Sequence, residues 1–291
     1  MEEDTKITEI TEAPSDSTYI LKPEIIQCNN LSKEYEIGDF IVKALDSVTF
    51  DIYRGEIVVF QGASGAGKST LLSIIGGLDT PTDGSVMIEW VRISDLSEES
   101  MSIFRVGTIG FIFQNYNLIS SLTAEENISF PMQLAQVEIP IQEGRVKKLL
   151  EKIGLQERGE HLPFQLSAGE QQRVGIARAF ANNPSIILAD EPTANLDKKT
   201  SQQIADLLVE MNKEGKTIIV ASHDDLIINQ AHRVFTIEDG KITSEKKLKD
   251  PPKIEDSPIP ENYLPCQNCE RYLPPGTKSC GFCGVIQLVK E

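Results

Sequence analysis

A glycine-rich segment in the first quarter of the chain has the residue types and spacing of a phosphate-binding loop. It follows a β-branched apolar run at residues 56–60 and precedes an apolar stretch at 71–75 with helical character. Strand, glycine-rich turn and helix form the context in which the pattern GxxxxGK[ST] binds phosphate through backbone N–H groups. The candidate phosphate-binding residues are Gly62, Ala63, Ser64, Gly65, Ala66, Gly67, Lys68, Ser69 and Thr70.

Two residues of this loop and two later carboxylates predict nucleotide chemistry. We expect Lys68 to reach the β- and γ-phosphates and the Ser69 hydroxyl to ligate Mg²⁺. A second apolar strand at residues 186–188 leads to Asp190 and Glu191. A carboxylate at a strand end beside a phosphate loop suits Mg²⁺, so Asp190 is the further candidate ligand. Glu191, one residue farther on, is placed to orient and deprotonate the attacking water.

Four more stretches narrow the class of nucleotide-binding protein. They are residues 76–84, 110–114, 166–179 and 188–197, the third of which contains Leu-Ser-Ala-Gly-Glu. On these motifs the chain resembles the nucleotide-binding subunits of ABC transporters. Within them it is most similar to the exporter and mechanotransmission group of lipoprotein-releasing, macrolide-exporting and cell-division ATPases. The resemblance runs from about residue 25 to about residue 245.

The resemblance implies three roles around the nucleotide of one subunit. Tyr35 would stack its ring on adenine, although a packed strand-end tyrosine is the plainer interpretation. Gln114 would touch Mg²⁺ and transmit the nucleotide state to a membrane partner. His223, after a strand at residues 217–220, would contact the γ-phosphate. The expected catalytic residues are therefore Glu191, His223, Lys68 and Gln114.

The resemblance also implies a second subunit, either another copy of this chain or a different ABC subunit. Ser167 and Gly169 would donate to the γ-phosphate held by that subunit, and Asp197 would lie at the interface of the head-to-tail dimer. The commoner wording of this segment is Leu-Ser-Gly-Gly-Gln, so Ala168 and Glu170 are departures. Both substituted side chains are familiar variants, and we expect activity to survive them.

Composition agrees with a peripheral ATPase. No apolar run approaches the ~18 residues that cross a bilayer, so we expect any membrane work to use a separate polytopic permease. This chain itself is expected at the cytoplasmic face of the cell membrane. The formal net charge of −16 argues against non-specific nucleic-acid binding, and no nucleic-acid partner is expected. Two alternatives stay open: a soluble ABC ATPase acting on nucleic acid or the ribosome, and a non-catalytic cassette that binds ATP to signal.

The expected fold is an α/β P-loop NTPase of the ABC cassette type. It combines a mainly parallel core sheet with a small antiparallel β subdomain and a helical subdomain at residues 114–165. Residues 1–24 are expected to be a disordered acidic tail, 25–247 the ATPase domain, and 248–262 a proline-rich linker. A small zinc ribbon is expected at 263–291.

The zinc prediction rests on two CxxC pairs, Cys266 with Cys269 and Cys280 with Cys283. Four thiolates at this spacing favour tetrahedral Zn²⁺, and so short a segment is too small to fold around a hydrophobic core. A redox pair or disulfides are the rival interpretations, but no thioredoxin-like βαβ pattern surrounds these cysteines. The expected cofactors are thus ATP, Mg²⁺ and Zn²⁺.

Overall fold

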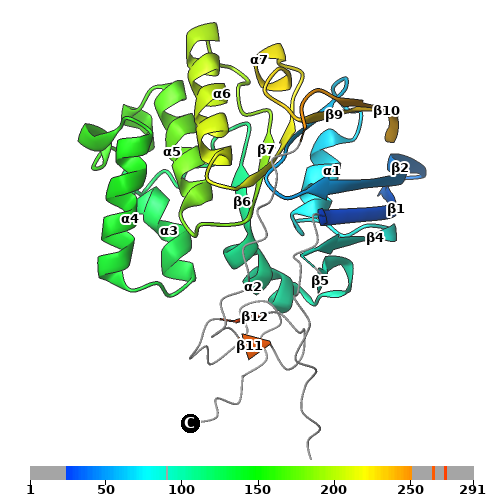
Figure 1. Ribbon diagram of the computed structural model, residues 1–291, viewed down its shortest axis with the longest axis horizontal. Coiled ribbons are helices and arrows are strands. Elements are labelled where there is room, and N and C mark those ends of the chain that lie inside the picture. The colour runs from blue at the N-terminus through cyan, green and yellow to red at the C-terminus, as the bar shows by residue number, and fades with distance from the viewer. Residues whose placement is uncertain (1–23, 90, 251–263, 266–271, 274–291) are drawn as a thin grey trace, which may run out of the picture.

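The computed structural model describes residues 24–89 and 91–250, together with two short strands at 264–265 and 272–273. The core is a six-stranded sheet in the order β10-β9-β3-β8-β7-β6, parallel except for β10 (Figure 1). Its strands are β3 (Ile57–Gln61), β6 (Ile109–Ile112), β7 (Ile186–Asp190), β8 (Thr217–Ala221), β9 (Arg233–Glu238) and β10 (Lys241–Lys247). The expected mainly parallel core sheet is confirmed.

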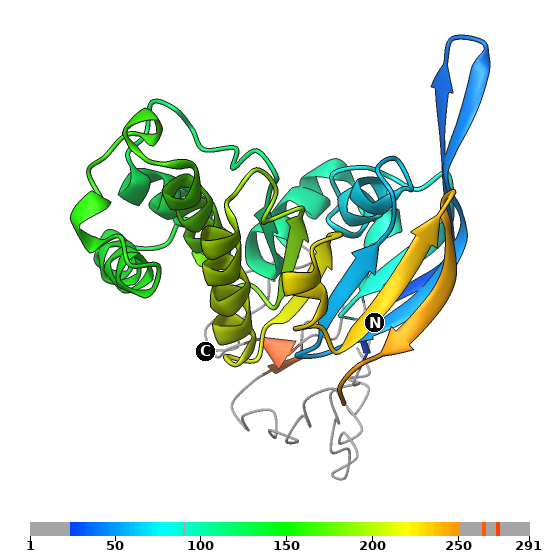
Figure 2. The same cartoon turned by 90° about the horizontal axis from the view of Figure 1, so that it is seen from above.

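A second, antiparallel sheet of four strands lies beside the core in the order β2-β1-β4-β5. Its strands are β1 (Glu24–Ile37), β2 (Phe40–Tyr53), β4 (Asp83–Ile88) and β5 (Val91–Arg92). The β1–β2 hairpin is longer than the sheet that carries it, and its end projects from the body of the molecule (Figure 2). Ile37, Phe40 and Ile41 at this end are exposed.

Seven α-helices of the described residues surround the two sheets (Figure 1). They are α1 (Lys68–Ile75), α2 (Glu98–Thr108), α3 (Ala124–Leu134), α4 (Ile139–Lys152), α5 (Ala168–Phe180), α6 (Lys198–Asn212) and α7 (Asp225–Ile228). Helices α3 and α4 form the expected helical subdomain and pack on α5. None of the described helices is long and apolar enough to cross a membrane.

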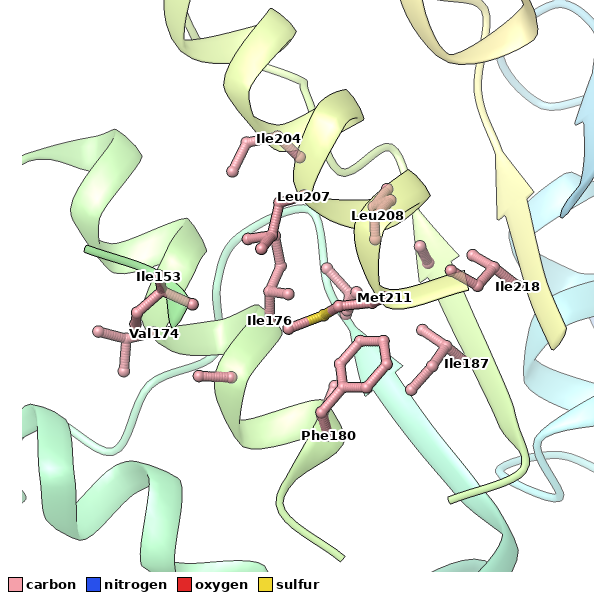
Figure 3. Close-up of a cluster of buried hydrophobic side chains, with 14 of the residues drawn as sticks. Ile153, Val174, Ile176, Phe180, Ile187, Ile204, Leu207, Leu208, Met211 and Ile218 are labelled. Carbon is pink, nitrogen blue, oxygen red and sulfur yellow. The ribbon is translucent and has the colours of Figure 1, made fainter. Parts of the chain in front are cut away.

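Side chains of the parallel strands alternate between two hydrophobic clusters, one on each face of the core sheet. Ile187 and Ala189 of β7 join α4, α5 and α6, and Figure 3 shows Ile187 beside Phe180 and Met211. Ile186 and Leu188 of the same strand join α1, α2 and the antiparallel sheet instead. Because successive side chains point to opposite faces, a strand buried on both faces must be apolar throughout.

The C-terminal segment is described only in part. Strands β11 (Leu264–Pro265) and β12 (Tyr272–Leu273) pair in an antiparallel manner within the region predicted to be a zinc ribbon. The four cysteines predicted to bind zinc lie outside the described residues, as do residues 1–23 of the tail expected at 1–24. Glu24, the last residue of that expected tail, begins β1. In the described part of the chain, no group of three or more His, Cys, Asp or Glu side chains could hold a metal ion.

The imidazole of His232 fastens β9 to β3 and makes the fold sensitive to acid. Its Nδ1 atom accepts a hydrogen bond from the Ile57 N–H at 2.8 Å, which requires an unprotonated nitrogen. Burial lowers the pKa of His232 below 6.5, and the positive charge of Lys249 lowers it further. A histidine whose pKa is lower when folded contributes stability above its unfolded pKa, which is lost as pH falls through the folded value.

We therefore expect the wild-type protein to lose more unfolding free energy than His232→Gln between about pH 8 and about pH 5.5. Urea unfolding at both pH values measures the difference. All other ionisable groups are the same in the two proteins, so the comparison isolates His232. An equal loss in the two proteins would contradict the assignment to His232.

Candidate nucleotide-binding site

Three neighbouring parallel strands end at the same edge of the core sheet and bring the predicted site residues together. Strand β8 lies between β3 and β7, and Ala221 is level with Phe60 on one side and Asp190 on the other. The phosphate loop (residues 62–70), His223 and Glu191 follow these three strands directly and therefore leave the sheet side by side. Residues more than a hundred positions apart in the sequence meet there.

The phosphate loop curls around its own lysine before α1 begins. Gly67 forms the N-terminal cap of α1 with a φ of 105°, in the left-handed region. The Lys68 ammonium donates to the carbonyls of Gly62 at 2.8 Å and Ala63 at 3.0 Å. Its side chain is 7% exposed, so a buried positive charge stands at the start of a helix. A helix N-terminus with a buried ammonium is a site for a polyanion.

Glu191 lies between this lysine and the predicted histidine. Its carboxylate is 3.9 Å from the Lys68 ammonium and 3.1 Å from Nδ1 of His223. The Glu191 backbone has a φ of 43°, unusual for a residue other than glycine, and its N–H donates to the Ala221 carbonyl at 2.9 Å. The strand edge thus fixes a half-buried carboxylate beside both a cation and an imidazole, as a general base requires.

Asp190 provides an oxygen suited to a cation. Its Oδ1 atom is buried and has no hydrogen-bond partner among the described residues. Burial raises the pKa of Asp190, with the Glu191 charge adding to the rise, while a Ser69 hydrogen bond and the Lys68 charge lower it. A buried carboxylate oxygen beside a serine hydroxyl fits the hard oxygen ligands of Mg²⁺. We find that the residues present suit this ion.

Tyr35 stands on β1 and meets the segment that follows α1. Its hydroxyl donates to Oδ2 of Asp79 at 2.6 Å, and Lys33 lies over its ring with the ammonium 4.9 Å from the centroid. The sequence named Tyr35 but did not single out these two neighbours. Asp79 was visible only as part of the motif at residues 76–84, and no spacing rule pairs it with Tyr35.

The signature segment (residues 166–170) forms the start of α5. Ser167 is the N-cap of α5, and its backbone N–H donates to the Glu170 carboxylate at 2.8 Å. Glu170 therefore completes a capping box, which glutamine can also form, so the capping box tolerates this departure from the common wording. A Cβ on Gly169 would lie 2.5 Å from Cγ2 of Thr200, which explains the small residue there.

Asp197 has a firm structural role in this subunit. It caps α6, accepting hydrogen bonds from the backbone N–H groups of Lys199 at 2.9 Å and Thr200 at 3.1 Å. The Thr200 hydroxyl also donates to it at 2.6 Å, and these bonds lower the pKa of Asp197. Thr200 touches both Asp197 and Gly169, so the two predicted interface residues share one surface.

Gln114 is exposed two residues after β6, at the same sheet edge as Asp190. The loop beyond it is held by Arg178 of α5, which the sequence analysis did not identify. The Arg178 guanidinium donates to the carbonyls of Asn117 at 2.5 Å and Tyr116 at 2.8 Å, two residues with positive φ. Helix α5, which begins at the signature segment, is therefore hydrogen-bonded to the loop after Gln114. Contact of Gln114 with Mg²⁺ stays a prediction.

Comparison with known proteins decides the family. Residues 45–194 match the family model described as ABC transporter. This chain belongs to the ABC transporter family. It is 44% identical over 219 residues to an uncharacterized ABC transporter ATP-binding protein of Thermotoga maritima, covering 75% of this chain and 94% of the relative. Its cassette is that of an ATP-hydrolysing transporter subunit, as the sequence predicted.

Two further relatives place the cassette among known shapes. The dimeric, post-hydrolysis structure of the cassette MJ0796 of Methanocaldococcus jannaschii, bound to ADP and Pi, matches with a TM-score of 0.74 and 41% identity. That match covers 77% of this chain and 99% of the other. A macrolide export ATP-binding/permease protein, MacB of Hyphomonas neptunium, is 43% identical over 79% of this chain. The chain covers 36% of that longer ABC protein.

Substitution of Gly67 by alanine tests the phosphate loop. A Cβ at this position would lie 2.4 Å from the Ala44 carbonyl oxygen, and the left-handed φ of 105° adds strain. We expect Gly67→Ala to weaken ATP binding by about tenfold or more and to lower the thermal midpoint. The reason is that the phosphate loop must shift away from Ala44 to make room for the added Cβ. Titration calorimetry and a thermal melt measure the two effects.

Gly144→Ala is the matched control. Gly144 lies within α4 and has no atom within 4 Å of the position of an added Cβ. The same chemical change there should leave ATP binding unaltered and stabilise the fold by about 0.5–1 kcal/mol. Equal behaviour of the two variants would show that the phosphate loop tolerates a side chain at Gly67.

Proposed function

We propose that this chain is the ATPase subunit of an exporter or mechanotransmission type of ABC system, and that it closes with a second ABC subunit on binding ATP. The observation that carries the proposal is the placement of α1 and α5. Helix α1 packs on one face of the core sheet and α5 on the other. The start of α5 thus lies on the other side of the core sheet from the helix that follows the phosphate loop of its own subunit. A second subunit supplies the missing phosphate.

Hydrolysis in this proposal uses side chains already gathered at the sheet edge. Lys68 and the loop N–H groups bind the β- and γ-phosphates, and Glu191 removes the proton from the attacking water. His223, 3.1 Å from Glu191, holds that carboxylate and contacts the γ-phosphate. Ser69, Asp190 and Gln114 would hold Mg²⁺, which supplies charge neutralisation for the phosphates when bound. Tyr35 stacks on adenine.

The second subunit completes the site from the opposite direction. Its Ser167 and Gly169 donate to the γ-phosphate, and Asp197 lies at the interface between the two subunits. Loss of the γ-phosphate removes what both subunits hold, so the pair opens. Nucleotide can drive a partner only through this difference in affinity between closed and open states.

The motion must reach a membrane protein for the cassette to act in transport. Arg178 ties the loop after Gln114 to α5, so a shift of the signature segment moves that loop as well. We infer that a separate polytopic permease docks near this loop and that the ATPase works at the cytoplasmic face of the membrane. The macrolide exporter relatives, whose name includes a permease, support a membrane partner in general terms.

The two alternative functions have less support. The relatives reported above are named as ABC transporter or macrolide export proteins, and none is named as a repair or translation factor. A cassette that binds ATP only to signal is disfavoured by the intact cluster of Lys68, Asp190, Glu191 and His223. The acidic net charge of −16 likewise gives nucleic acid no attractive surface on average.

The proposed domain organisation adds a zinc-binding end to the cassette. We assign residues 25–247 to the ATPase domain, 248–262 to a linker and 263–291 to a small zinc ribbon. The two CxxC pairs support zinc, and the short antiparallel pairing of β11 with β12 is the kind of hairpin that such ribbons contain. The ribbon would offer a surface for a partner or for the dimer.

Glu191→Gln is the first variant that tests the function. Glutamine keeps the size of the side chain but cannot take a proton, so hydrolysis should fall by at least about a hundredfold while ATP still binds. The closed pair should then accumulate with ATP, and light scattering should report twice the mass of the chain. A pull-down from solubilised native membranes with this variant and ATP, read by mass spectrometry, should recover a polytopic protein.

Glu210→Gln is the control, since Glu210 is an exposed residue of α6 and the chemical change is the same. It should hydrolyse ATP and show no ATP-trapped dimer. Recovery of only ribosomal or nucleic-acid-bound proteins with Glu191→Gln would overturn the transporter proposal in favour of the soluble alternative. A Glu191→Gln variant that stays monomeric with ATP would argue against a site shared between two copies of this chain.

Metal analysis of the full chain tests the zinc ribbon. We expect about one zinc per chain in protein purified without added metal, and its loss in Cys266→Ser/Cys269→Ser, because two thiolates cannot complete a tetrahedral site. Cys28→Ser is the control, since this buried thiol belongs to β1 and should not affect zinc. Metal-free protein with fewer than the expected free thiols would support disulfides instead.

A further inference from the structure

The hydroxyl of Tyr35 is bound to a carboxylate that the reaction itself does not use. Asp79 lies between the end of α1 and the start of β4, and its Oδ2 atom accepts the Tyr35 hydroxyl at 2.6 Å. Helix α1 begins at the phosphate loop. The contact therefore joins the strand that carries Tyr35 to the segment directly after the phosphate-binding helix.

The Asp79 carboxylate is itself fixed by two neighbours. Its Oδ1 atom accepts from the Lys33 ammonium at 2.6 Å and from the Thr80 backbone N–H at 2.7 Å. Lys33 also donates to the Thr80 carbonyl at 2.7 Å, and its side chain is only 12% exposed. With one oxygen held in this way, the other is directed at Tyr35.

Charge makes this contact directional. Burial tends to raise the pKa of Asp79, but hydrogen bonds from Lys33, Tyr35 and Thr80 together hold it below its usual value. Burial and the Asp79 hydrogen bond raise the pKa of the Tyr35 hydroxyl, while a hydrogen bond with Thr70 acts the other way. Near neutral pH Tyr35 is thus the donor and Asp79 the charged acceptor, the stronger class of hydrogen bond.

Lys33 also limits which face of the tyrosine ring is available. Lys33 and Tyr35 are two residues apart on one strand, so their side chains share a face. The Lys33 ammonium lies over the Tyr35 ring, 4.9 Å from its centroid. A base that stacks on Tyr35 would use the other face of the ring.

The strand needs such a restraint because Tyr35 lies beyond the β1–β4 pairing, in the two-stranded part of the β1–β2 hairpin. The end of this hairpin projects from the body of the molecule (Figure 2). Strand β1 pairs with β4 only as far as Ser32, and beyond it β2 is the remaining strand partner. The β1–β2 register shifts on both sides of Lys33. A two-stranded ribbon is marginally stable alone, so β pairing does not by itself fix the direction of the Tyr35 ring.

We propose that Asp79, held by Lys33, is a positioning residue that fixes the Tyr35 ring as the platform for the nucleotide base. The inference rests on the proposed stacking of Tyr35 on adenine. The contact between Asp79 and Tyr35 serves recognition of the base and not of the phosphates. Asp79 and Lys33 therefore contribute to ATP affinity without touching the reacting atoms.

Comparison of ATP with inorganic tripolyphosphate separates base recognition from general damage, because tripolyphosphate has no base. Loss of one charged hydrogen bond should cost Asp79→Ala and Tyr35→Phe roughly three- to tenfold in ATP affinity. Tripolyphosphate affinity should change by less than about twofold in both variants, and in Asp79→Ala the kcat at saturating MgATP should stay within about twofold. Asp79→Asn keeps an acceptor and should retain part of the affinity.

Two controls complete the experiment. Asp95→Ala removes an exposed aspartate, paired with Arg92 at 3.8 Å, and should bind both ligands like the wild type. Tyr35→Ala removes the stacking surface and should lose on the order of tenfold or more for ATP, again sparing tripolyphosphate. Thermal midpoints of all variants record whether the fold is intact.

The outcomes distinguish the two levels of the argument. Unchanged ATP affinity in Asp79→Ala, with a loss in Tyr35→Ala, would overturn the positioning role and leave the proposed stacking intact. Equal losses for ATP and tripolyphosphate in Asp79→Ala would also overturn it, since the phosphate loop would then be disturbed. Unchanged ATP affinity in Tyr35→Ala would overturn the stacking and the positioning role together. A wild-type chain that binds tripolyphosphate as tightly as ATP would do the same.

Discussion

Strand β8 lies between β3 and β7, and the site depends on this placement. The three strands are parallel and buried on both faces, so their carboxyl ends must open at one edge of the sheet. The phosphate loop, His223 and Glu191 are then neighbours without any direct link in the sequence. Helix α1 adds its N-terminus at this edge, and the buried Lys68 ammonium adds a full charge. The remaining parts of the site are arranged around that positive centre.

Two sets of hydrogen bonds connect this centre to the loop after Gln114 and to the β1–β2 hairpin. Arg178 joins the loop after Gln114 to α5, and Asp79 joins the β1–β2 hairpin to the segment after α1. Both are hydrogen bonds of charged side chains to groups on another element. The Arg178 bonds concern the phosphate end of a nucleotide and the transmission of its state to a partner. The Asp79 bond concerns the base. The phosphate loop itself is held by bonds of its own, because the Lys68 ammonium donates to the carbonyls of Gly62 and Ala63.

The sequence predicted the parts of the fold that local pattern controls. The apolar runs at residues 186–188 and 217–220 are strands, and Gly67 does begin a helix, because burial on both faces and φ above zero leave direct marks on residue type. The start of β3 was misplaced by one residue. Glu56 is buried, but its carboxylate accepts from the Tyr53 N–H and the Arg233 guanidinium, and the ladder begins at Ile57. Contacts between residues far apart in the chain, such as those of Arg178 with Asn117 and of His232 with Ile57, left no pattern to find. The same is true of the Tyr35–Asp79 pair, since any two surface-strand and loop residues of these types look alike in sequence.

The backbone of Glu191 has a consequence for how this protein could evolve. Its φ of 43° is a conformation that glycine or asparagine adopts more easily, and of order 1–3 kcal/mol of folding stability is given up to keep glutamate there. Position 191 is therefore a point where activity and stability compete. Replacement of Glu191 by glycine or asparagine removes the carboxylate and can raise the folding stability. A lineage that ceased to need hydrolysis would tend to lose its glutamate early, with folding as the selective gain.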